Sequence, residues 1–449
     1  MIFFIFISAF ILRLVSLNQS LWLDEGTTAR VVQHYGFFQI VSKFSPSDFH
    51  PPLYYLLMKL WTGFFGYSEI SLRMPSVLFS LLTAWIIYLI GKKNKNASIG
   101  FWAAAFFLFN PLIVYYSQEA RMYMMATFLL AAALYYFLEL SRSKKLMSSL
   151  LLFNLFIFLS FLTFYGSIFF IAALYFYLLF KKKYQLLFQL LPGLLLSLII
   201  VFPLLQKQWM NSRQALILIA NWKNVLGQAN IKNLLLIPLK FSLGRISFEP
   251  KKLYYIIGGL WSLLVFWLVS QGTTRSRNKF GIMLGTFLIF PIFLGFVFSF
   301  FTPLLQYFRF IYLIPIMALL LSFSTSNRVY RLIVICGFAV LSTVYLFNPT
   351  FHREDWKSLA KSLAPKQEVY MIPSSSDALR YYNKAIIIHD IRDLKQLPHS
   401  LIILPYTTDI YGIDYKKILL SNGFVLKESK TFRGLSYEVW ESKIFYSLR

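Results

Sequence analysis

Two adjacent carboxylates, Asp24 and Glu25, stand directly after the first apolar segment of the chain. A charged carboxylate next to a membrane span costs free energy, so we interpret such a residue first as part of a functional site. Loss of water raises the pKa of a carboxyl group toward neutrality, which suits general-base catalysis. We therefore expect Asp24 and Glu25 to be the catalytic pair, with Asp24 as the base. The alternative is that Asp24 only caps a helix and Glu25 is a solvated neighbour.

Two further groups could bind a substrate. In the first, Asp48 and His50 precede two prolines and Tyr54; the prolines would fix the backbone at the membrane surface, where His50 could bond a phosphate or a sugar hydroxyl. The alternative is a proline kink with a satisfied histidine. The second group is Glu119, Arg121 and Tyr123. Glu119 would orient an acceptor or bind a cation, and Arg121 would hold an anion; alternatively the two pair with each other or with lipid headgroups.

Arginines at the ends of apolar runs complete the predicted site. Arg73 and Arg309 occupy such positions, and residues 206–250 carry six Lys and Arg side chains against Glu249 alone. Arginine binds phosphate through a planar fork, and the nearest anion at this depth is a lipid phosphate. We predict that Arg73 and Arg309 bind substrate, although any single cation could instead bind anionic headgroups. No metal or cofactor is required, but with acids at 24, 48 and 119 a divalent cation remains possible.

These groups belong to a chain of 449 residues that is 58% hydrophobic and only 14% charged, which is typical of a polytopic α-helical membrane protein. A net charge of +26 could suggest nucleic acid, but much of it lies in short loops between apolar runs, so we expect membrane lipids and no nucleic acid as partners. A single cysteine excludes a disulfide framework. The N-terminal apolar segment lacks a basic start and a cleavage site, so we expect it to be retained.

Hydropathy predicts about eleven transmembrane helices within residues 1–347, and basic clusters mark alternate loops as cytoplasmic. The N-terminus is then cytoplasmic, and the outer loops are 18–70, 115–121 and 206–250. The predicted spans lie near 1–17, 70–90, 98–115, 122–140, 147–165, 167–180, 184–205, 252–271, 280–301, 308–323 and 329–347. The basic clusters are Lys92, Lys93 and Lys95; Arg142, Lys144 and Lys145; Lys181, Lys182 and Lys183; Arg275, Arg277 and Lys279; and Arg328 and Arg331.

Two regions outside these spans have their own patterns. Residues 27–43 have helical spacing of apolar positions, which predicts an amphipathic helix on the membrane surface with Asp24 near its start. Residues 348–449 have ordinary soluble proportions and predict a small extracytoplasmic α/β domain. We expect its helices at 355–364, 376–383 and 415–422, its strands at 368–372, 385–388 and 401–404, and a final hairpin of 425–429 with 436–440.

Three runs resemble one known family. LWLDEGTTARVVQ, HPPLYYLLMKLWTGFFGYSEISLRMPSVLFSLL and SQEARMYMMATFLL are similar, in order and spacing, to bacterial family 39-like glycosyltransferases of the protein-mannosyltransferase and aminoarabinose-transferase type, within the GT-C superfamily. The resemblance covers about residues 10–180; later, QYFRFIYLIP and FHREDWKSLAK match in style. It implies an integral inner-membrane enzyme of GT-C fold. Such an enzyme moves a sugar, with inversion, from a polyprenyl-phosphate donor to a hydroxyl of a lipid, glycan or protein acceptor outside the cytoplasm.

The resemblance also implies roles for individual residues. Asp24 corresponds to the family's catalytic aspartate and Glu119 to the acidic position of its second outer loop. His50 stands where aminoarabinose-transferring relatives have a lysine that contacts the donor phosphate. Arg121 and Arg309 are expected to stabilise the departing phosphate.

Two other function classes remain open. A lipid-linked glycan flippase or transporter should place polar groups near the bilayer midplane within broken helices, whereas here six of the seven acids before residue 348 lie in the predicted outer loops. A glycan polymerase or ligase would share the topology but would not use a lipid-monophosphate sugar.

Overall fold

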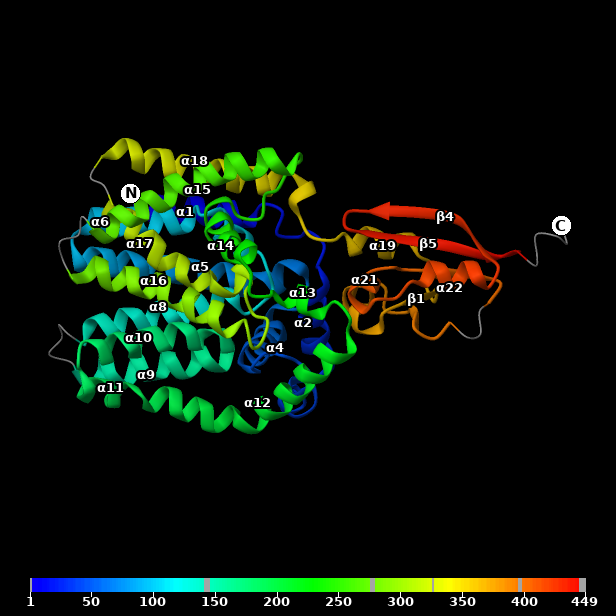
Figure 1. Ribbon diagram of the computed structural model, residues 1–449, viewed down its shortest axis with the longest axis horizontal. Helices are drawn as coiled ribbons and strands as arrows, with labels where there is room; N and C mark the ends of the chain where they lie inside the picture. The colour runs from blue at the N-terminus through cyan, green and yellow to red at the C-terminus, as the bar shows by residue number, and fades with distance from the viewer. Residues whose placement is uncertain (1, 141–145, 275–278, 325–326, 395–397, 444–449) are drawn as a thin grey trace.

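The computed structural model describes residues 2–140, 146–274, 279–324, 327–394 and 398–443. A helical bundle is joined at one end to a small C-terminal sheet domain (Figure 1). The predicted basic residues at 142–145 and 275–277 lie outside the described residues. The chain is an integral membrane protein with the predicted fold class.

The bundle is built from helices of very different length. They are α1 (Ile2–Leu14), α2 (Leu23–His34), α3 (Phe37–Gln39), α4 (Leu53–Phe65), α5 (Glu69–Asn94), α6 (Ala97–Leu108), α7 (Pro111–Ser117), α8 (Tyr123–Glu139), α9 (Leu146–Thr163), α10 (Ile168–Phe180), α11 (Tyr184–Leu190), α12 (Pro192–Leu218), α13 (Trp222–Leu226), α14 (Ile231–Leu243), α15 (Lys251–Thr274), α16 (Lys279–Phe298), α17 (Ile314–Ser324) and α18 (Arg328–Phe347). Short π- or 3-10 helices form η1 (Ile40–Phe44), η2 (Ser45–Ser47), η3 (Tyr165–Ser167), η4 (Tyr307–Leu313) and η5 (Pro349–Phe351).

Every apolar run predicted to cross the membrane falls on one or more of these helices. Within the described residues, seven helices are long and apolar enough to span a membrane, or eight if the bent pair α6 and α7 counts as one. Three further apolar helices are shorter, at Ile2–Leu14, Tyr123–Glu139 and Tyr165–Phe180. The number of about eleven spans therefore stays a prediction.

The bend between α6 and α7 positions the loop that follows α7. Asn110 caps α7 by accepting hydrogen bonds from the backbone N–H groups of Leu112 and Ile113, and its own amide donates to the Phe241 carbonyl at 2.7 Å. Pro111 occupies the first helical turn, where its missing N–H costs nothing. The two helices meet at 63°. The chain therefore turns sharply inside the bundle and delivers Glu119 and Arg121 to one end of it.

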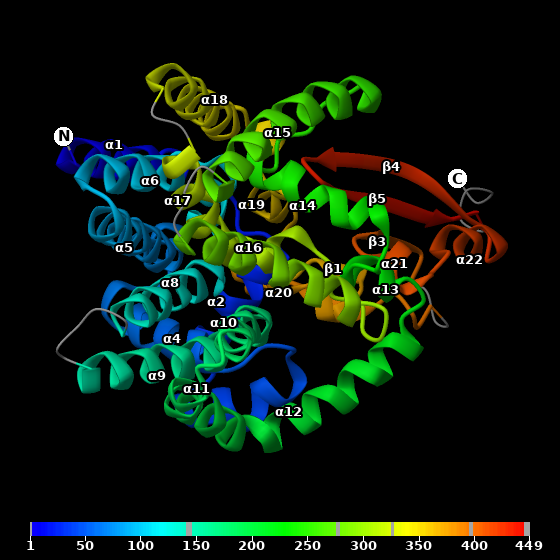
Figure 2. The same cartoon turned by 60° about the vertical axis from the view of Figure 1, so that its left-hand side comes forward.

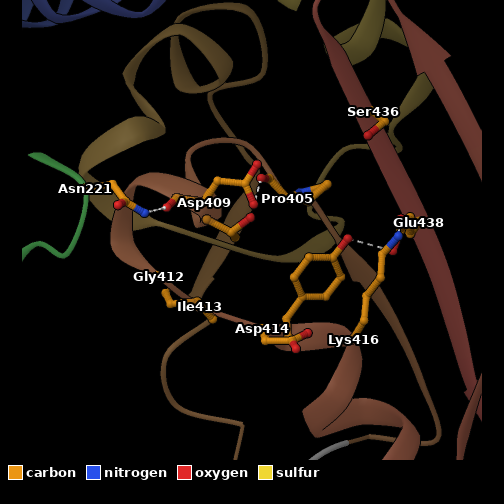
Figure 3. A pocket seen from close by; sticks show the side chains of 11 residues that line it. Asn221, Pro405, Asp409, Gly412, Ile413, Asp414, Lys416, Ser436 and Glu438 are labelled. Carbon is orange, nitrogen blue, oxygen red and sulfur yellow. Dashed lines mark hydrogen bonds and ion pairs between the residues drawn. The ribbon is translucent and has the colours of Figure 1, made fainter. Parts of the chain in front are cut away.

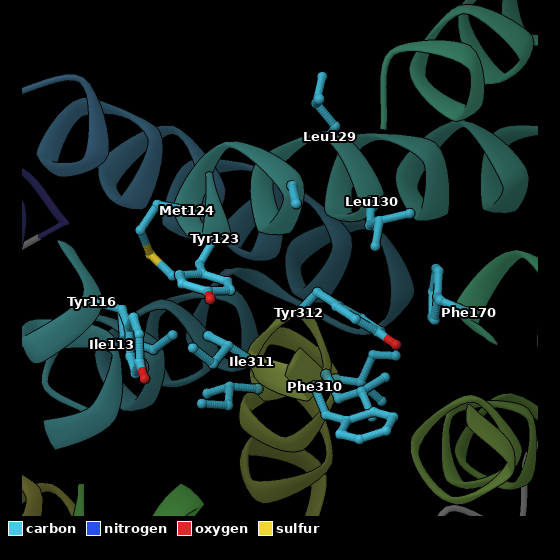
Figure 4. Packing of buried hydrophobic residues seen from close by; sticks show 14 of the residues in the cluster. Ile113, Tyr116, Tyr123, Met124, Leu129, Leu130, Phe170, Phe310, Ile311 and Tyr312 are labelled. Carbon is cyan, nitrogen blue, oxygen red and sulfur yellow. The ribbon is translucent and has the colours of Figure 1, made fainter. Parts of the chain in front are cut away.

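Buried aromatic and aliphatic side chains hold this end rigidly (Figure 4). Tyr116 and Tyr123 pack edge to face with ring centroids 5.2 Å apart, and Tyr123 also contacts Phe308 at 5.7 Å. Close-packed rings of this kind leave little room for rearrangement. The elements α7, α8 and η4 thus form one framework for the residues between them.

The amphipathic surface helix predicted at 27–43 is wrong in extent. The helix α2 ends at His34, and Gly36 separates it from α3 and η1. One face of α2 is covered by the C-terminal domain: a Cβ on Gly26 would lie 2.4 Å from the backbone nitrogen of Ala378. Only the shorter second segment, with Phe37 and Phe38, exposes large apolar side chains. Tertiary packing against another domain could not be read from the periodicity.

The C-terminal domain agrees with the predicted α/β pattern. Its five strands lie in the order β2-β1-β3-β5-β4, with β1 parallel to β2 and β3, and β5 antiparallel to both β3 and β4. The strands are β1 (Glu368–Met371), β2 (Ile387–Asp390), β3 (Ser400–Ile403), β4 (Phe424–Phe432) and β5 (Leu435–Ser442). The helices are α19 (Trp356–Ser362), η6 (Pro373–Ser375), α20 (Asp377–Tyr382), α21 (Thr408–Tyr411) and α22 (Tyr415–Ser421). The predicted final hairpin is confirmed.

Several contacts join the domain to the bundle. Arg30 of α2 pairs with Asp377 of α20 at 2.7 Å, and Lys357 pairs with Glu69 at 2.8 Å. The backbone N–H of Leu21 donates to the Tyr382 hydroxyl. Figure 2 shows the same docking from a second side. The segment that carries Asp24 is thus enclosed between the two parts of the chain.

Candidate functional site

Glu25 is buried at the centre of a saturated network. Its carboxylate accepts two hydrogen bonds from Arg73, at 2.8 and 2.6 Å, one from the backbone N–H of Ala120 at 2.8 Å, and one from the backbone N–H of Trp22 at 3.3 Å. The last bond completes a capping arrangement at the start of α2. These bonds tie α2 to α5 and to the loop after α7. The arrangement gives Glu25 a positioning role.

Arg73 is equally occupied. Besides its two bonds to Glu25, its guanidinium donates to the carbonyls of Leu17, Gln19 and Ser20 at 2.7–3.0 Å. A guanidinium has five N–H donors, and all five are used. The prediction that Arg73 binds substrate therefore has no support in this geometry, because no donor remains. Sequence alone did not reveal that its partners are the chain segments around it.

Asp24, one residue away, is much less buried than Glu25. Its side chain is 37% exposed, and its Oδ2 lies 3.7 Å from Nη2 of Arg121. That distance is too long for a hydrogen bond. Among the described residues, no group donates a hydrogen bond to this carboxylate, and it caps no backbone N–H. The capping alternative is therefore wrong for Asp24, whose oxygens remain available to accept a proton.

Arg121 connects Asp24 to the proline-flanked loop. Its Nη1 donates to the Tyr55 hydroxyl at 3.1 Å, and Tyr55 donates to Asp48 at 2.9 Å. The other Asp48 oxygen lies 3.4 Å from Nδ1 of His50. Burial raises the pKa of Asp48, but His50 and Arg121 outweigh that effect and hold it below its ordinary value. The structure thus brings three predicted groups into one connected row.

The C-terminal half of α12 holds this loop in place. Gln208 donates to the carbonyls of Ser45 and His50, at 2.7 and 3.0 Å, and Asn211 donates to the carbonyl of Pro46. The run of amide and charged residues at 206–214, which follows the apolar half of α12, is the sequence signal that could have indicated this contact. Its hydrogen bonds explain why the backbone of the loop is ordered without regular secondary structure.

Glu119 does not pair with Arg121, so the predicted alternative of a pair between the two is wrong, whereas pairing with lipid headgroups stays a prediction. Its Oε1 instead accepts from Arg353, at 2.9 Å from Nη2, while Oε2 is buried with no partner. Burial raises the pKa of Glu119 above its ordinary value, although the charges of Arg353 and Arg245 act in the opposite direction. The Arg353 guanidinium also lies 3.7 Å from the ring centroid of Trp22. Arg353 comes from the FHREDW segment that opens the C-terminal domain, and it was not among the predicted site residues.

The remaining predicted residues lie around this row. Tyr54 is buried beside Tyr55, with ring centroids 5.9 Å apart, and Tyr123 packs against Phe308. Arg309 is half-buried and donates to the Leu226 carbonyl at 3.2 Å. Arg245 is one of the six cations at 206–250, to which the sequence assigned no individual role. Its guanidinium lies 5.0 Å from the ring centroid of Tyr115. The same ring is 5.5 Å from Arg353, so two guanidinium groups flank it.

Two further features complete the description. Within the described ranges, no three His, Cys, Asp or Glu side chains come close enough to hold a metal ion, and the need for a cation stays an untested prediction. A polar hollow of about 710 Å³ lies in the C-terminal domain beside Asn221 (Figure 3). None of the predicted site residues lines it.

Comparisons with known proteins agree with the fold. The family of dolichyl-phosphate-mannose-protein mannosyltransferases matches residues 49–206. ArnT from Cupriavidus metallidurans, solved in the apo state and bound to undecaprenyl phosphate, is similar in structure, with a TM-score of 0.58 and 14% identity over 97% of each chain. No curated protein matches the sequence.

A third likeness covers less of the other chain. The archaeal oligosaccharyltransferase AglB from Archaeoglobus fulgidus, in complex with an inhibitory peptide and a dolichol-phosphate, has a TM-score of 0.53 and 12% identity over 86% of this chain and 64% of its own. At such identities the likenesses show the fold. They confirm the GT-C fold expected from the sequence, and the family match over residues 49–206 agrees with it.

Proposed function

We propose that this GT-C superfamily chain transfers a sugar from a polyprenyl-phosphate donor to a hydroxyl group on the extracytoplasmic side of the membrane. The acceptor hydroxyl attacks the anomeric carbon as Asp24 takes its proton. The bond between that carbon and the phosphate oxygen breaks on the opposite face, so the configuration inverts and polyprenyl phosphate leaves.

The observation that carries this proposal is the contrast between the two adjacent acids. The Glu25 carboxylate accepts four hydrogen bonds and the residue is 1% exposed, whereas the Asp24 carboxylate accepts none from the described residues and is partly exposed. A general base needs a free oxygen that can reach the proton it removes. Asp24 meets this requirement, and the rigid pair of Glu25 with Arg73 fixes the helix on which Asp24 stands.

Nearby cations suit the departing phosphate. Arg121 is 4% exposed, and its Nε–H is buried without a partner. Arg309 lies 5.8 Å from the ring centroid of Phe308, which packs against Tyr123. Arg245 lies 5.0 Å from the ring centroid of Tyr115, which packs against Tyr116. Pre-positioned cations in a site of low polarity stabilise a charge that grows in the transition state. A phosphate leaving group needs such stabilisation and does not by itself require a metal.

The similar proteins support this donor class. ArnT has been solved with undecaprenyl phosphate and AglB with dolichol-phosphate, and the matched family is described by a dolichyl-phosphate sugar. All are polyprenyl phosphates. We infer the same class of carrier here, with the N-terminus in the cytoplasm and the C-terminal domain outside.

The test is release of polyprenyl phosphate by the purified protein from a panel of donors that carry mannose, glucose, galactosamine or aminoarabinose. Release from at least one donor, with the inverted configuration in the product, is the expected result. Movement of intact donor across a vesicle membrane without cleavage would instead assign the protein to the flippases.

A further inference from the structure

Arg353 lies in the segment between η5 and α19, where the chain passes from the bundle into the C-terminal domain. Its backbone is tied to the turn between β4 and β5. The Nε–H of Arg433 donates to the Arg353 carbonyl at 2.7 Å, and the backbone N–H of Asp355 donates to the Arg433 carbonyl at 2.9 Å. Asp355 also caps α19 by accepting a hydrogen bond from the backbone N–H of Ser358 at 3.1 Å. The domain therefore fixes the position from which the Arg353 side chain starts.

The Arg353 side chain extends from this segment to two separate parts of the bundle. Its Nε and Nη2 donate to Oε1 of Glu119, at 3.3 and 2.9 Å, in the loop after α7. The same guanidinium lies 3.7 Å from the ring centroid of Trp22, the residue that precedes α2. The Arg353 side chain is 19% exposed and that of Glu119 is 4% exposed. Both contacts are therefore largely shielded from water, which strengthens interactions of a charged group.

These two contacts flank the proposed base. Trp22 precedes Asp24 by two residues, and Glu119 precedes Arg121 by two residues. Oδ2 of Asp24 lies 3.7 Å from Nη2 of Arg121. A movement of about 1 Å toward each other would bring these atoms to hydrogen-bond distance and occupy the oxygen that must accept the proton. The spacing of the two chain segments thus decides whether the carboxylate of Asp24 is free.

Bonds within the bundle hold the backbone of the loop after α7, but not the Glu119 carboxylate. The backbone N–H of Ala120 donates to Glu25 at 2.8 Å, and Ser76 donates to the Glu119 carbonyl at 2.6 Å. Among the described residues, Arg353 is the one cation that pairs with the Glu119 carboxylate, whose Oε2 has no partner there. Loss of the Arg353 guanidinium would therefore leave a folded loop with a buried, unpaired carboxylate.

We propose that Arg353 is a positioning residue of the transfer reaction, which sets the spacing between Asp24 and Arg121 from the C-terminal domain. The inference rests on the proposed function and adds that this domain completes the active site. Arginine suits the role because a planar guanidinium can donate two N–H groups to a carboxylate while its face lies on an aromatic ring. Arg353→Lys would keep the charge but lose the fork and the flat face.

The experiment measures the Tm, the kcat and the KM for a donor that wild type cleaves, in Arg353→Lys and in Trp22→Leu. The first variant keeps the charge and the second keeps the ion pair, so each removes only part of the arrangement. Both should lower kcat on the order of 10–10²-fold, as a misplacement of about 1 Å does, with the KM for the donor unchanged. Arg30→Met is the matched control. Arg30 also joins α2 to the C-terminal domain, through Asp377 at 2.7 Å, and its replacement should leave kcat as in wild type.

A second background separates positioning from a general loss of structure. Asp24→Asn lacks the proposed base, so its residual transfer no longer depends on where that carboxylate lies. Arg353→Lys should therefore cause no further loss of rate in the Asp24→Asn background. Structural damage would instead lower the rate by the same factor in both backgrounds.

Four results would overturn the inference. These are a wild-type kcat in both Arg353→Lys and Trp22→Leu, an equal further loss of rate in the Asp24→Asn background, a raised KM for the donor with unchanged kcat, or a Tm below the assay temperature in both variants. The third result would make Arg353 a contact of the donor, and the fourth would assign it to stability alone. If wild type cleaves no donor at all, the proposed function itself fails, and that result is distinct from the other four.

Discussion

Replacement of Glu25 by glutamine should destabilise the folded protein around the site and should not remove a reacting group. The charge of Glu25 balances Arg73 in a place where the two side chains are 1–2% exposed. Loss of one partner from a buried pair typically costs about 3–5 kcal/mol, because the other charge stays buried. Three carbonyls still hold Arg73 in the variant, so it cannot move into water.

The magnitude can be converted to a melting temperature. The entropy of unfolding is about 2.1 cal/mol/K per residue, so for 449 residues the expected loss lowers the apparent Tm by about 3–5 °C. The assay is thermal unfolding of the detergent-purified protein. Glu139→Gln is the control, since its partner Lys93 is 43% exposed and such a pair contributes only about 0–1 kcal/mol.

A double variant sharpens the test. Glu25→Gln with Arg73→Gln should be less unstable than the sum of the single variants, because the unpaired charge is removed as well. If Glu25→Gln kept the wild-type Tm and lost all activity, Glu25 would belong to the chemistry and the positioning role would be refuted.

Three further outcomes are expected. Gly26→Ala places a methyl group 2.4 Å from the backbone of the C-terminal domain, so it should lower the free energy of unfolding by about 1–3 kcal/mol and increase proteolysis of that domain. Gly63→Ala, which has open space around it, should change neither quantity. Equal proteolysis of the two variants would contradict the contact between α2 and the C-terminal domain. The pKa of Asp48 lies below its ordinary value of 3.8, so the ionised carboxylate stabilises the folded protein above that pH and loses this effect as the pH falls through the folded pKa. The Tm difference between wild type and Asp48→Asn should therefore be constant above about pH 5 and shrink below about pH 4. A Tm difference that persists at low pH would refute this. Cysteines introduced at Lys92 and Lys430 in a cysteine-free background should react with an impermeant label from opposite sides of the membrane; labelling from one side would break the predicted topology.

Much of the architecture followed from local signals. Apolar runs and basic clusters located the helices, and the alternation after residue 348 located the strands, because both depend on neighbouring residues. The helix predicted at 27–43 failed because α2 is buried by α20, a contact that joins segments some 350 residues apart in sequence. Periodicity reports an apolar face but not what covers it.

The site was predictable in its residue types but not in its pairing. Asp24, Asp48 and Arg121 were expected to act together, and the structure places them in one row. Arg73 was expected at the substrate and instead binds Glu25, because which cation neutralises which acid depends on the fold. Arg353 was missed for the same reason: its partner Glu119 lies 234 positions away.

The most direct test of the account is the rate of polyprenyl-phosphate release by Asp24→Asn, with binding of the donor measured in the same preparation. Asp377→Asn is the control. Asp377 pairs with Arg30, which is on α2 as Asp24 is, but this pair lies in the interface between the bundle and the C-terminal domain. The account predicts that Asp24→Asn binds donor normally and transfers its sugar on the order of 10²–10⁴-fold more slowly, while the control stays within a small factor of wild type. Transfer by Asp24→Asn at the wild-type rate would contradict the assignment of the base.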